Sequence, residues 1–287
     1  MNIIEAQNLA CPIDGDGLEP SGKQLTCKNG HTFDLARQGY INLLPVQHKR
    51  SKQPGDSKAM VVARRRFLDT AIYQPIAERL SQIVYTQICD KNEVCLLDAG
   101  CGEGYYFDFL YKSLAMKQGT SVLSFIGLDI SKDAIIQSTK RNKQISWIVG
   151  TNRQPPLLDE SVDIIICLFG FFSADGFNRV LKPGGRIILV DPGSGHLKEL
   201  REIIYPEINK TDTIETSSDI KSNFQQIASE KLQYKTKISD NALINDLLIM
   251  TPHFYRASKE GREAACGLSA IEITVDVIFR LLEKNRP

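Results

Sequence analysis

The chain has 287 residues, a formal net charge of +1, and 42% hydrophobic and 24% charged residues. This composition supports one large folded domain with additions, and the near-zero charge excludes binding of nucleic acid through overall charge alone. No apolar run approaches the roughly 18 residues of a membrane span, and the first residues lack the basic start of a signal peptide. Seven cysteines, most of them inside predicted strands or motifs, favour a reducing compartment, so we expect a cytoplasmic protein.

Residues 1–46 carry metal-ligand residue types at short spacing. Cys27 and His31 are close enough in sequence to point at one ion, as the two ligands of a zinc knuckle must. Cys11 begins a second knuckle, in which Asp14 stands where a cysteine is expected, and a carboxylate is an accepted but less common zinc ligand. Two interpretations stay open: a zinc-ribbon-like domain with a mixed ligand set, or a metal-free ribbon held by the packing of its apolar side chains.

Residues 47–72 form a basic connector between this unit and the rest of the chain. Pro54 and Gly55 predict that its first part is a loop, and residues 61–68 have the pattern of a helix. Concentrated positive charge predicts contact with RNA phosphates, although a solvated linker with a charged helix face is the other interpretation. Because a ribbon lies beside it, we favour RNA binding by Lys49, Arg50, Lys52, Arg64, Arg65 and Arg66.

A glycine-rich loop follows a short apolar strand that ends near residue 97. Glycine lets the backbone turn sharply and approach a ligand, and the loop falls at a strand's carboxyl end, where open α/β sheets bind ligands. The spacing Gly100-x-Gly102-x-Gly104, with Asp98 before it, resembles the first motif of class I S-adenosyl-L-methionine methyltransferases. The second predicted strand ends in Asp129, whose carboxylate can accept both hydroxyls of a ribose.

The remaining pattern predicts an α/β fold of the class I, Rossmann-like methyltransferase type in residues 73–287. Residues 145–149 and 162–168 predict further parallel strands, and the alternation over residues 271–279 predicts an antiparallel C-terminal hairpin. Phe169, Phe171 and Phe172 follow the fourth strand, where they either stack a target base or pack into the core.

Beyond these elements, residues 39–57, the glycine loop and the Cys11 and His31 motifs together resemble the family of 23S rRNA guanine-N1 methyltransferases (RlmA), over residues 11–252. The resemblance implies a homodimer that transfers a methyl group from S-adenosyl-L-methionine to N1 of one guanine in a 23S rRNA stem-loop. It implies that zinc ligands fall on Cys11, Asp14, Cys27 and His31, where the family has cysteine at the second position. It also implies cofactor contacts at Tyr73, Gly102, Glu103 and His196.

The roles of several residues stay open on sequence alone. Tyr73 is either a cover of the cofactor pocket or a core tyrosine. Asp191 is the candidate for the base that removes the guanine N1 proton, and His196 is a second candidate that fits better as a cofactor neighbour. Two other classes of protein are considered: a methyltransferase for a small molecule or a protein, and an RNA-binding protein without catalytic activity.

Overall fold

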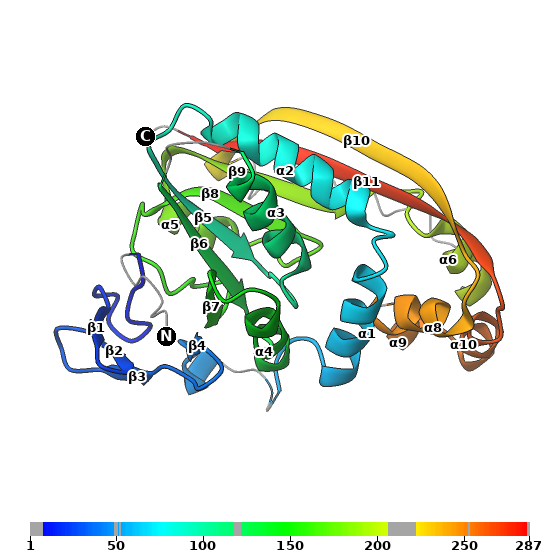
Figure 1. Cartoon of the computed structure of the whole chain (residues 1–287), viewed down its shortest axis with the longest axis horizontal. Helices are drawn as coiled ribbons and strands as arrows, with labels where there is room; N and C mark the ends of the chain where they lie inside the picture. Colours follow the sequence, from blue (N-terminus) through cyan, green and yellow to red (C-terminus); the bar gives the residue numbers. More distant parts are fainter. Residues whose placement is uncertain are drawn as a thin grey trace.

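The computed structural model describes residues 8–48, 51, 53–117, 122–205, 222–251 and 253–285. Its main feature is an eight-stranded, mostly parallel sheet in which β11 runs antiparallel to both of its neighbours (Figure 1). This arrangement confirms the predicted class I α/β fold with an antiparallel C-terminal hairpin. In spatial order the strands are β10 (Phe224–Ile238), β11 (Ile271–Lys284), β9 (Leu181–Pro192), β8 (Val162–Leu168), β5 (Glu93–Ala99), β6 (Val122–Asp129), β7 (Ser146–Val149) and β4 (Tyr40–Asn42).

Successive residues of the central strands pack on opposite faces of the sheet, because side chains alternate along a strand. Leu96 and Ile164 belong to one buried cluster, and Leu97 and Ile165 belong to another. The second cluster is covered by the N-terminal unit and by the short helix α5 (Ala174–Val180). The first cluster is covered by α2 (Gln74–Ile88), α3 (Tyr105–Ala115) and α4 (Lys132–Arg141).

The N-terminal unit is joined to the large sheet instead of standing apart from it. Strand β4, which the sequence places inside residues 1–46, pairs in parallel with β7 as the edge strand of the large sheet. Upstream of it, Ala10 N–H donates to Pro156 O at 3.0 Å, and Leu158 N–H donates to Asn8 O at 2.9 Å. The three strands left to the unit form a small sheet: β1 (Glu19–Ser21), β2 (Gln24–Thr26) and β3 (Thr32–Asp34).

A helical lobe lies at the end of the long β10–β11 hairpin (Figure 1). The lobe consists of α6 (Lys198–Ile204), α8 (Asn241–Ile249), α9 (His253–Arg256) and α10 (Lys259–Cys266), with α1 (Lys58–Leu68) of the connector beside it. The helices α8, α9 and α10 connect the two hairpin strands, and α6 precedes the hairpin. The helix predicted in the basic connector, α1, packs against α8, and α10 packs against α6. Ser57 caps α1, because its hydroxyl accepts a hydrogen bond from Met60 N–H at 3.3 Å. The short helix η1 (Val46–His48) follows β4.

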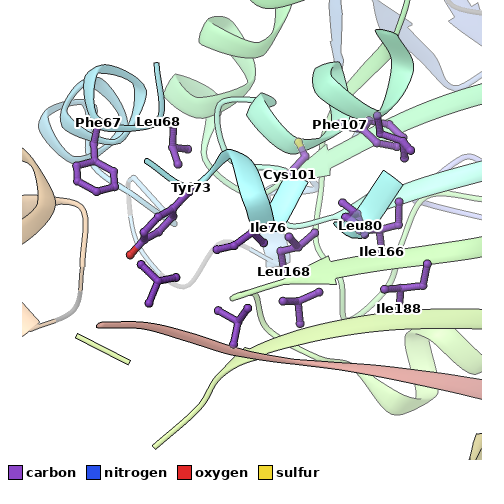
Figure 2. Packing of buried hydrophobic residues seen from close by; sticks show 14 of the residues in the cluster. Phe67, Leu68, Tyr73, Ile76, Leu80, Cys101, Phe107, Ile166, Leu168 and Ile188 are labelled. Atoms are coloured by element: carbon purple, nitrogen blue, oxygen red, sulfur yellow. The ribbon is translucent and has the colours of Figure 1, made fainter. Parts of the chain in front are cut away.

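The turn between α1 and α2 connects this lobe to the sheet. Figure 2 shows the ring of Tyr73 beside Phe67, with its hydroxyl directed toward β11. The two rings meet edge to face, with centroids 5.1 Å apart, and both side chains are buried. Tyr73 is therefore held in the core while its polar end reaches the carboxyl end of the sheet.

Candidate functional site

The glycine loop between β5 and α3 has the backbone that its sequence predicts. All three glycines have positive φ values: 92° at Gly100, 56° at Gly102 and 84° at Gly104. A Cβ at Gly104 would lie 2.8 Å from the Trp147 ring, so the start of α3 needs glycine for packing as well. At Gly100 and Gly102 the nearest atoms to such a Cβ are 3.7 and 3.6 Å away. These two glycines therefore leave backbone accessible to a ligand.

Two acids stand behind this loop: Asp98, which is buried, and Asp129, which is partly buried. Asp129 Oδ2 accepts a hydrogen bond from Gly102 N–H at 2.9 Å, and Oδ1 accepts one from Ser131 N–H at 2.8 Å. Burial raises the pKa of Asp129. Burial, reinforced by the negative charge of Asp129, raises the pKa of Asp98 to about 8. We call this edge of the sheet, with Gly100, Gly102 and the two acids, the crevice. It thus holds a carboxyl group that is neutral at neutral pH and is ready to lose its proton beside a cation.

Tyr73, Phe169 and His196 come together from three separate segments at the ends of β8 and β9. His196 Nδ1 accepts a hydrogen bond from Asp276 N–H at 3.2 Å, so Nε2 carries the proton and faces Tyr73 Oη at 3.4 Å. Burial lowers the pKa of His196 to about 4, which keeps the ring neutral. The Phe169 ring stacks on His196 with centroids 6.0 Å apart.

This aromatic group adjoins the glycine loop. A Cβ at Gly100 would lie 3.7 Å from Gly170 Cα, in the loop that carries Phe169. The structure therefore brings six predicted cofactor residues to one edge of the sheet, within two adjacent groups. They are Tyr73, Asp98, Gly100, Gly102, Asp129 and His196.

The remaining two predicted cofactor residues support the loop from behind. Gly104 begins α3, as described above. The Glu103 carboxylate turns toward α4, where its Oε2 accepts hydrogen bonds from Arg141 Nε at 2.8 Å and Nη2 at 2.5 Å. Glu103 Oε1 is buried and has no hydrogen-bond partner among the described residues. That oxygen is available to a polar group that the structure does not contain.

The candidate base, Asp191, sits at the end of β9 with a cationic partner. Arg280 Nη1 donates a hydrogen bond to Asp191 Oδ2 at 2.5 Å, and both residues are buried. Burial raises the pKa of Asp191 while the guanidinium opposes that rise. The sequence offered no signal for this pair, because Arg280 lies 89 residues away in a predicted strand.

Each of the three predicted RNA-binding arginines on α1 has a partner within the chain. Arg64 forms an ion pair with Asp56 in the connector loop. Arg66 Nε donates to Asp246 Oδ2 on α8 at 2.7 Å, across 180 residues of sequence. Arg65 Nη1 donates to the Gln137 side chain of α4 at 3.0 Å. These contacts fasten α1 between α4 and α8, and the other predicted residues, Lys49, Arg50 and Lys52, lie outside the described residues.

The four predicted metal ligands converge. One ligand atom from each of the four residues lies within 4.8 Å of the others, and Asp14 Oδ2 is 2.9 Å from His31 Nδ1. Cys27 Sγ is 3.3 Å from the same carboxylate oxygen. Asn29 Nδ2 donates to that oxygen at 2.9 Å and so fixes its direction. Two thiols, one imidazole and one carboxylate fit a tetrahedral zinc ion chemically, and Cys11 completes the set.

The aromatic run after β8 divides between the core and the surface. Phe172 packs on Phe177 with ring centroids 5.2 Å apart, whereas Phe169 is 41% exposed and Phe171 is 54% exposed. Core packing is therefore confirmed for Phe172, whereas stacking of a target base by the exposed Phe169 or Phe171 stays a prediction. The sequence analysis missed Arg153, whose guanidinium carbon lies 4.7 Å from the centroid of the Phe171 ring. The available signal was its place in the loop that follows the third predicted strand.

Two family models match parts of the chain. The model described as the RlmA N-terminal zinc ribbon matches residues 9–52, and a methyltransferase domain model matches residues 97–189. With the parallel sheet and its glycine loop, they define a class I methyltransferase that carries an N-terminal zinc-ribbon-type unit. In the described part of the chain, every helix is too short or too polar to cross a lipid bilayer.

Three relatives share most of the architecture. A Micromonospora griseorubida protein assigned as a 23S rRNA (guanine-N1)-methyltransferase is 30% identical, over 67% of this chain and 68% of its own length. A Bacillus subtilis protein with the same assignment, YxjB, is 29% identical over 96% of both chains. The 23S rRNA (guanine(748)-N1)-methyltransferase of Streptomyces fradiae is 27% identical over 94% of this chain and 95% of its own. The chain belongs to this family of 23S rRNA (guanine-N1)-methyltransferases, which confirms the expected family.

Proposed function

We propose that this protein transfers a methyl group from S-adenosyl-L-methionine to N1 of a specific guanine in 23S rRNA. The observation that carries the proposal is the glycine loop at the ends of β5 and β6, where Gly100 and Gly102 present bare backbone in front of the partly buried Asp129. Family membership supports the substrate, since all three named relatives are assigned as 23S rRNA (guanine-N1)-methyltransferases.

The crevice residues suit the parts of the proposed cofactor. Asp129 oxygens accept the ribose hydroxyls, and the Gly100 and Gly102 backbone borders the methionine part. When bound, the cofactor supplies a methyl group on a sulfonium, and the protein's task is to align it with the acceptor. Neutral Tyr73 and His196 form a polar wall without adding positive charge beside that sulfonium.

Guanine N1 holds a proton at neutral pH, so a base must take it. Both ring nitrogens of His196 already face described partners, one toward Asp276 N–H and the other toward Tyr73. The described contact of Asp191 uses only Oδ2, and burial raises its pKa, which makes it a stronger base. We therefore retain Asp191 as the proposed base.

The N-terminal unit and the connector serve recognition in this proposal. Cys11, Asp14, Cys27 and His31 hold Zn²⁺, which fixes the loops of the unit. Lys49, Arg50 and Lys52 contact RNA phosphates. Arg64, Arg65 and Arg66 act by holding α1 in place as well as by charge. We expect the protein to work in the cytoplasm as a homodimer, in line with its family.

The decisive test is mass spectrometry of 23S rRNA from cells with and without the gene. We expect one guanine to lose its N1 methyl group in the deletion strain and to regain it when the wild-type gene is returned. Purified protein should also methylate unmodified 23S rRNA, and an Asp129→Ala variant should not. Unchanged guanine methylation in the deletion strain would reject the rRNA substrate, and absence of cofactor binding would reject the enzyme.

A further inference from the structure

Arg153 and Phe171 form an exposed cation–π pair in two loops beside the glycine loop. Phe171 lies in the loop after β8 and is 54% exposed, and Arg153 lies in the loop after β7. The guanidinium carbon stands 4.7 Å from the ring centroid, which is a cation–π arrangement. The Phe171 ring therefore leaves aromatic surface open to solvent.

The pair is held in place from beneath. Asn152, which is 9% exposed, donates a hydrogen bond from Nδ2 to Phe171 O at 2.9 Å and so ties the two loops together. The same Nδ2 would lie 3.8 Å from a Cβ at Gly100, so the pair adjoins the glycine loop. Thr151 and Gln154 form a further backbone bridge that closes the Arg153 loop. The position of the pair is therefore fixed by the fold before a ligand arrives.

The positive charge of Arg153 is available to a ligand, whereas the charges of the α1 arginines are engaged within the protein. Arg64 and Arg66 each form an ion pair with an aspartate, whereas Arg153 has no carboxylate within ion-pair distance among the described residues. A guanidinium plane over a phenyl ring offers a flat surface and a positive charge together. Nucleobases stack on such surfaces, and their phosphates carry the complementary charge.

We propose that Arg153 and Phe171 form a stacking platform for an unpaired nucleobase that neighbours the target guanine in the RNA. This inference rests on the proposed function and adds the place of a second base. Phe169, two residues before Phe171, stacks on His196 on the cofactor side, so the target guanine belongs there and its neighbour belongs on Phe171. Stacking of the neighbouring base on the platform thereby helps to keep the target guanine flipped out of its stack.

The experiment uses the full chain and a synthetic hairpin of 23S rRNA that carries the guanine mapped by mass spectrometry. Affinities for the hairpin and for S-adenosyl-L-methionine are measured for the wild type, Phe171→Leu and Arg153→Lys. Leucine keeps an apolar side chain but removes the ring, and lysine keeps the charge but removes the plane. Tyr85→Leu is the matched control, because Lys117 Nζ lies 3.6 Å over that ring near the far end of α2.

We expect Phe171→Leu and Arg153→Lys each to weaken hairpin affinity by about fivefold or more, the lower end of what loss of one base stack costs. Cofactor affinity should not change, and Tyr85→Leu should match the wild type in both measurements. Abasic substitution of the nucleotides beside the target guanine then identifies the stacked base. At one of those positions, the abasic hairpin should bind the wild type and Phe171→Leu equally.

Two results would overturn the platform. One is wild-type hairpin affinity in both variants. The other is a loss of hairpin affinity in Phe171→Leu that persists with every abasic hairpin. Where the stacked base has been removed, replacing the ring should no longer change the affinity. Failure of the proposed function would look different, because the wild type would then not methylate the hairpin, whatever the affinities of the variants.

Discussion

The cofactor crevice and the metal cluster are both built from loop residues, but the large sheet fixes only the first of them completely. Gly100 N–H and Cys101 N–H both donate to Leu128 O, at 2.7 and 3.0 Å, so the glycine loop is tied to the next strand without any ligand. In the cluster, Cys11 and Cys27 are buried against the sheet, whereas Asp14 is exposed. Three-residue strands carry the rest of the ribbon.

This difference shows how a site depends on what lies beneath it. A loop between two packed parallel strands inherits its shape from the core, so the ligand finds the site preformed. A loop on short exposed strands buries little surface, and an ion must supply the missing free energy. We therefore expect substitutions in the crevice to act on binding, and substitutions in the cluster to act on local order.

The largest effect should come from Gly102→Arg. The side chain would enter the space that the bare backbone leaves, at a residue with a φ of 56°. We expect cofactor affinity to fall by about a hundredfold or more in calorimetry. Gly184→Arg is the matched control, since Gly184 has a φ of 70° and open space around it, but lies in the turn inside β9. Unaltered cofactor affinity in Gly102→Arg would contradict the placement of the cofactor at this loop.

The metal cluster can be tested through its carboxylate. Asp14→Cys should raise zinc affinity by about tenfold or more in competition with a chromophoric chelator, because thiolate is the softer ligand. Cys27→Ser should lower zinc affinity and increase amide exchange around residues 11–31, with little change across the large sheet. Asp16→Asn, next to the cluster, is the control. Equal zinc affinity in the wild type and Asp14→Cys would mean that residue 14 is not a ligand.

A smaller effect is expected in the pH dependence of cofactor affinity. The Asp98 carboxyl has its pKa raised to about 8, and a bound sulfonium favours its ionised form, so binding should release a proton below that pH. Cofactor affinity should therefore rise with pH from 6 to 8, approaching tenfold per unit, and level off above. Calorimetry in buffers of different ionisation enthalpy measures the proton directly. In Asp98→Asn, the pH dependence should be lost; its persistence would assign the proton to another group.

In the absence of cofactor, the Asp98 carboxyl affects the free energy of unfolding. This free energy should fall as pH rises, whereas cofactor affinity should rise. Between the unfolded pKa of roughly 4 and the folded value of about 8, the folded state holds a proton that the unfolded chain has lost. Asp98 therefore makes the protein less stable as pH rises through that window. Asp98→Asn should gain stability relative to the wild type from low to high pH, as thermal unfolding at several pH values will show.

The smallest effect is expected from a substitution of Asp276, whose backbone N–H holds His196. Asp276 is fully buried, and its Oδ2 accepts a hydrogen bond from Gly195 N–H at 2.9 Å, while Lys231 Nζ lies 3.2 Å from Oδ1. Asp276→Asn keeps the shape and loses the charge, so cofactor affinity should fall by about threefold through a looser His196 loop. Glu272→Gln, in the exposed pair with Lys235, should have no effect. Equal cofactor affinity in both variants would show that the Asp276 carboxylate does not support the cofactor site.

Much of the fold and part of the site could be predicted because the signals are local. The apolar strands, the helix starts and the C-terminal alternation follow from periods of a few residues. The glycines of the loop were predictable because a sharp turn with positive φ favours glycine, and Asp129 because a strand's end fixes its place. The metal ligands follow from short spacing, and the structure brings all four together.

Partners far apart in sequence could not be predicted in this way. Arg66 meets Asp246 across 180 residues, and Asp191 meets Arg280 across 89, because the order of strands and the placement of helices decide these contacts. The same holds for β4, whose three residues give no sign that they extend the large sheet beside β7.

The amino-acid sequence by itself determined the class of fold, the backbone of the glycine loop and the four residues proposed as metal ligands, since each depends on short patterns along the chain. Only the tertiary structure decided which charges stay available. It paired the arginines of α1 with acids and left Arg153 stacked on an exposed ring. A charge becomes available for binding through the absence of a partner in space, and no local pattern records that.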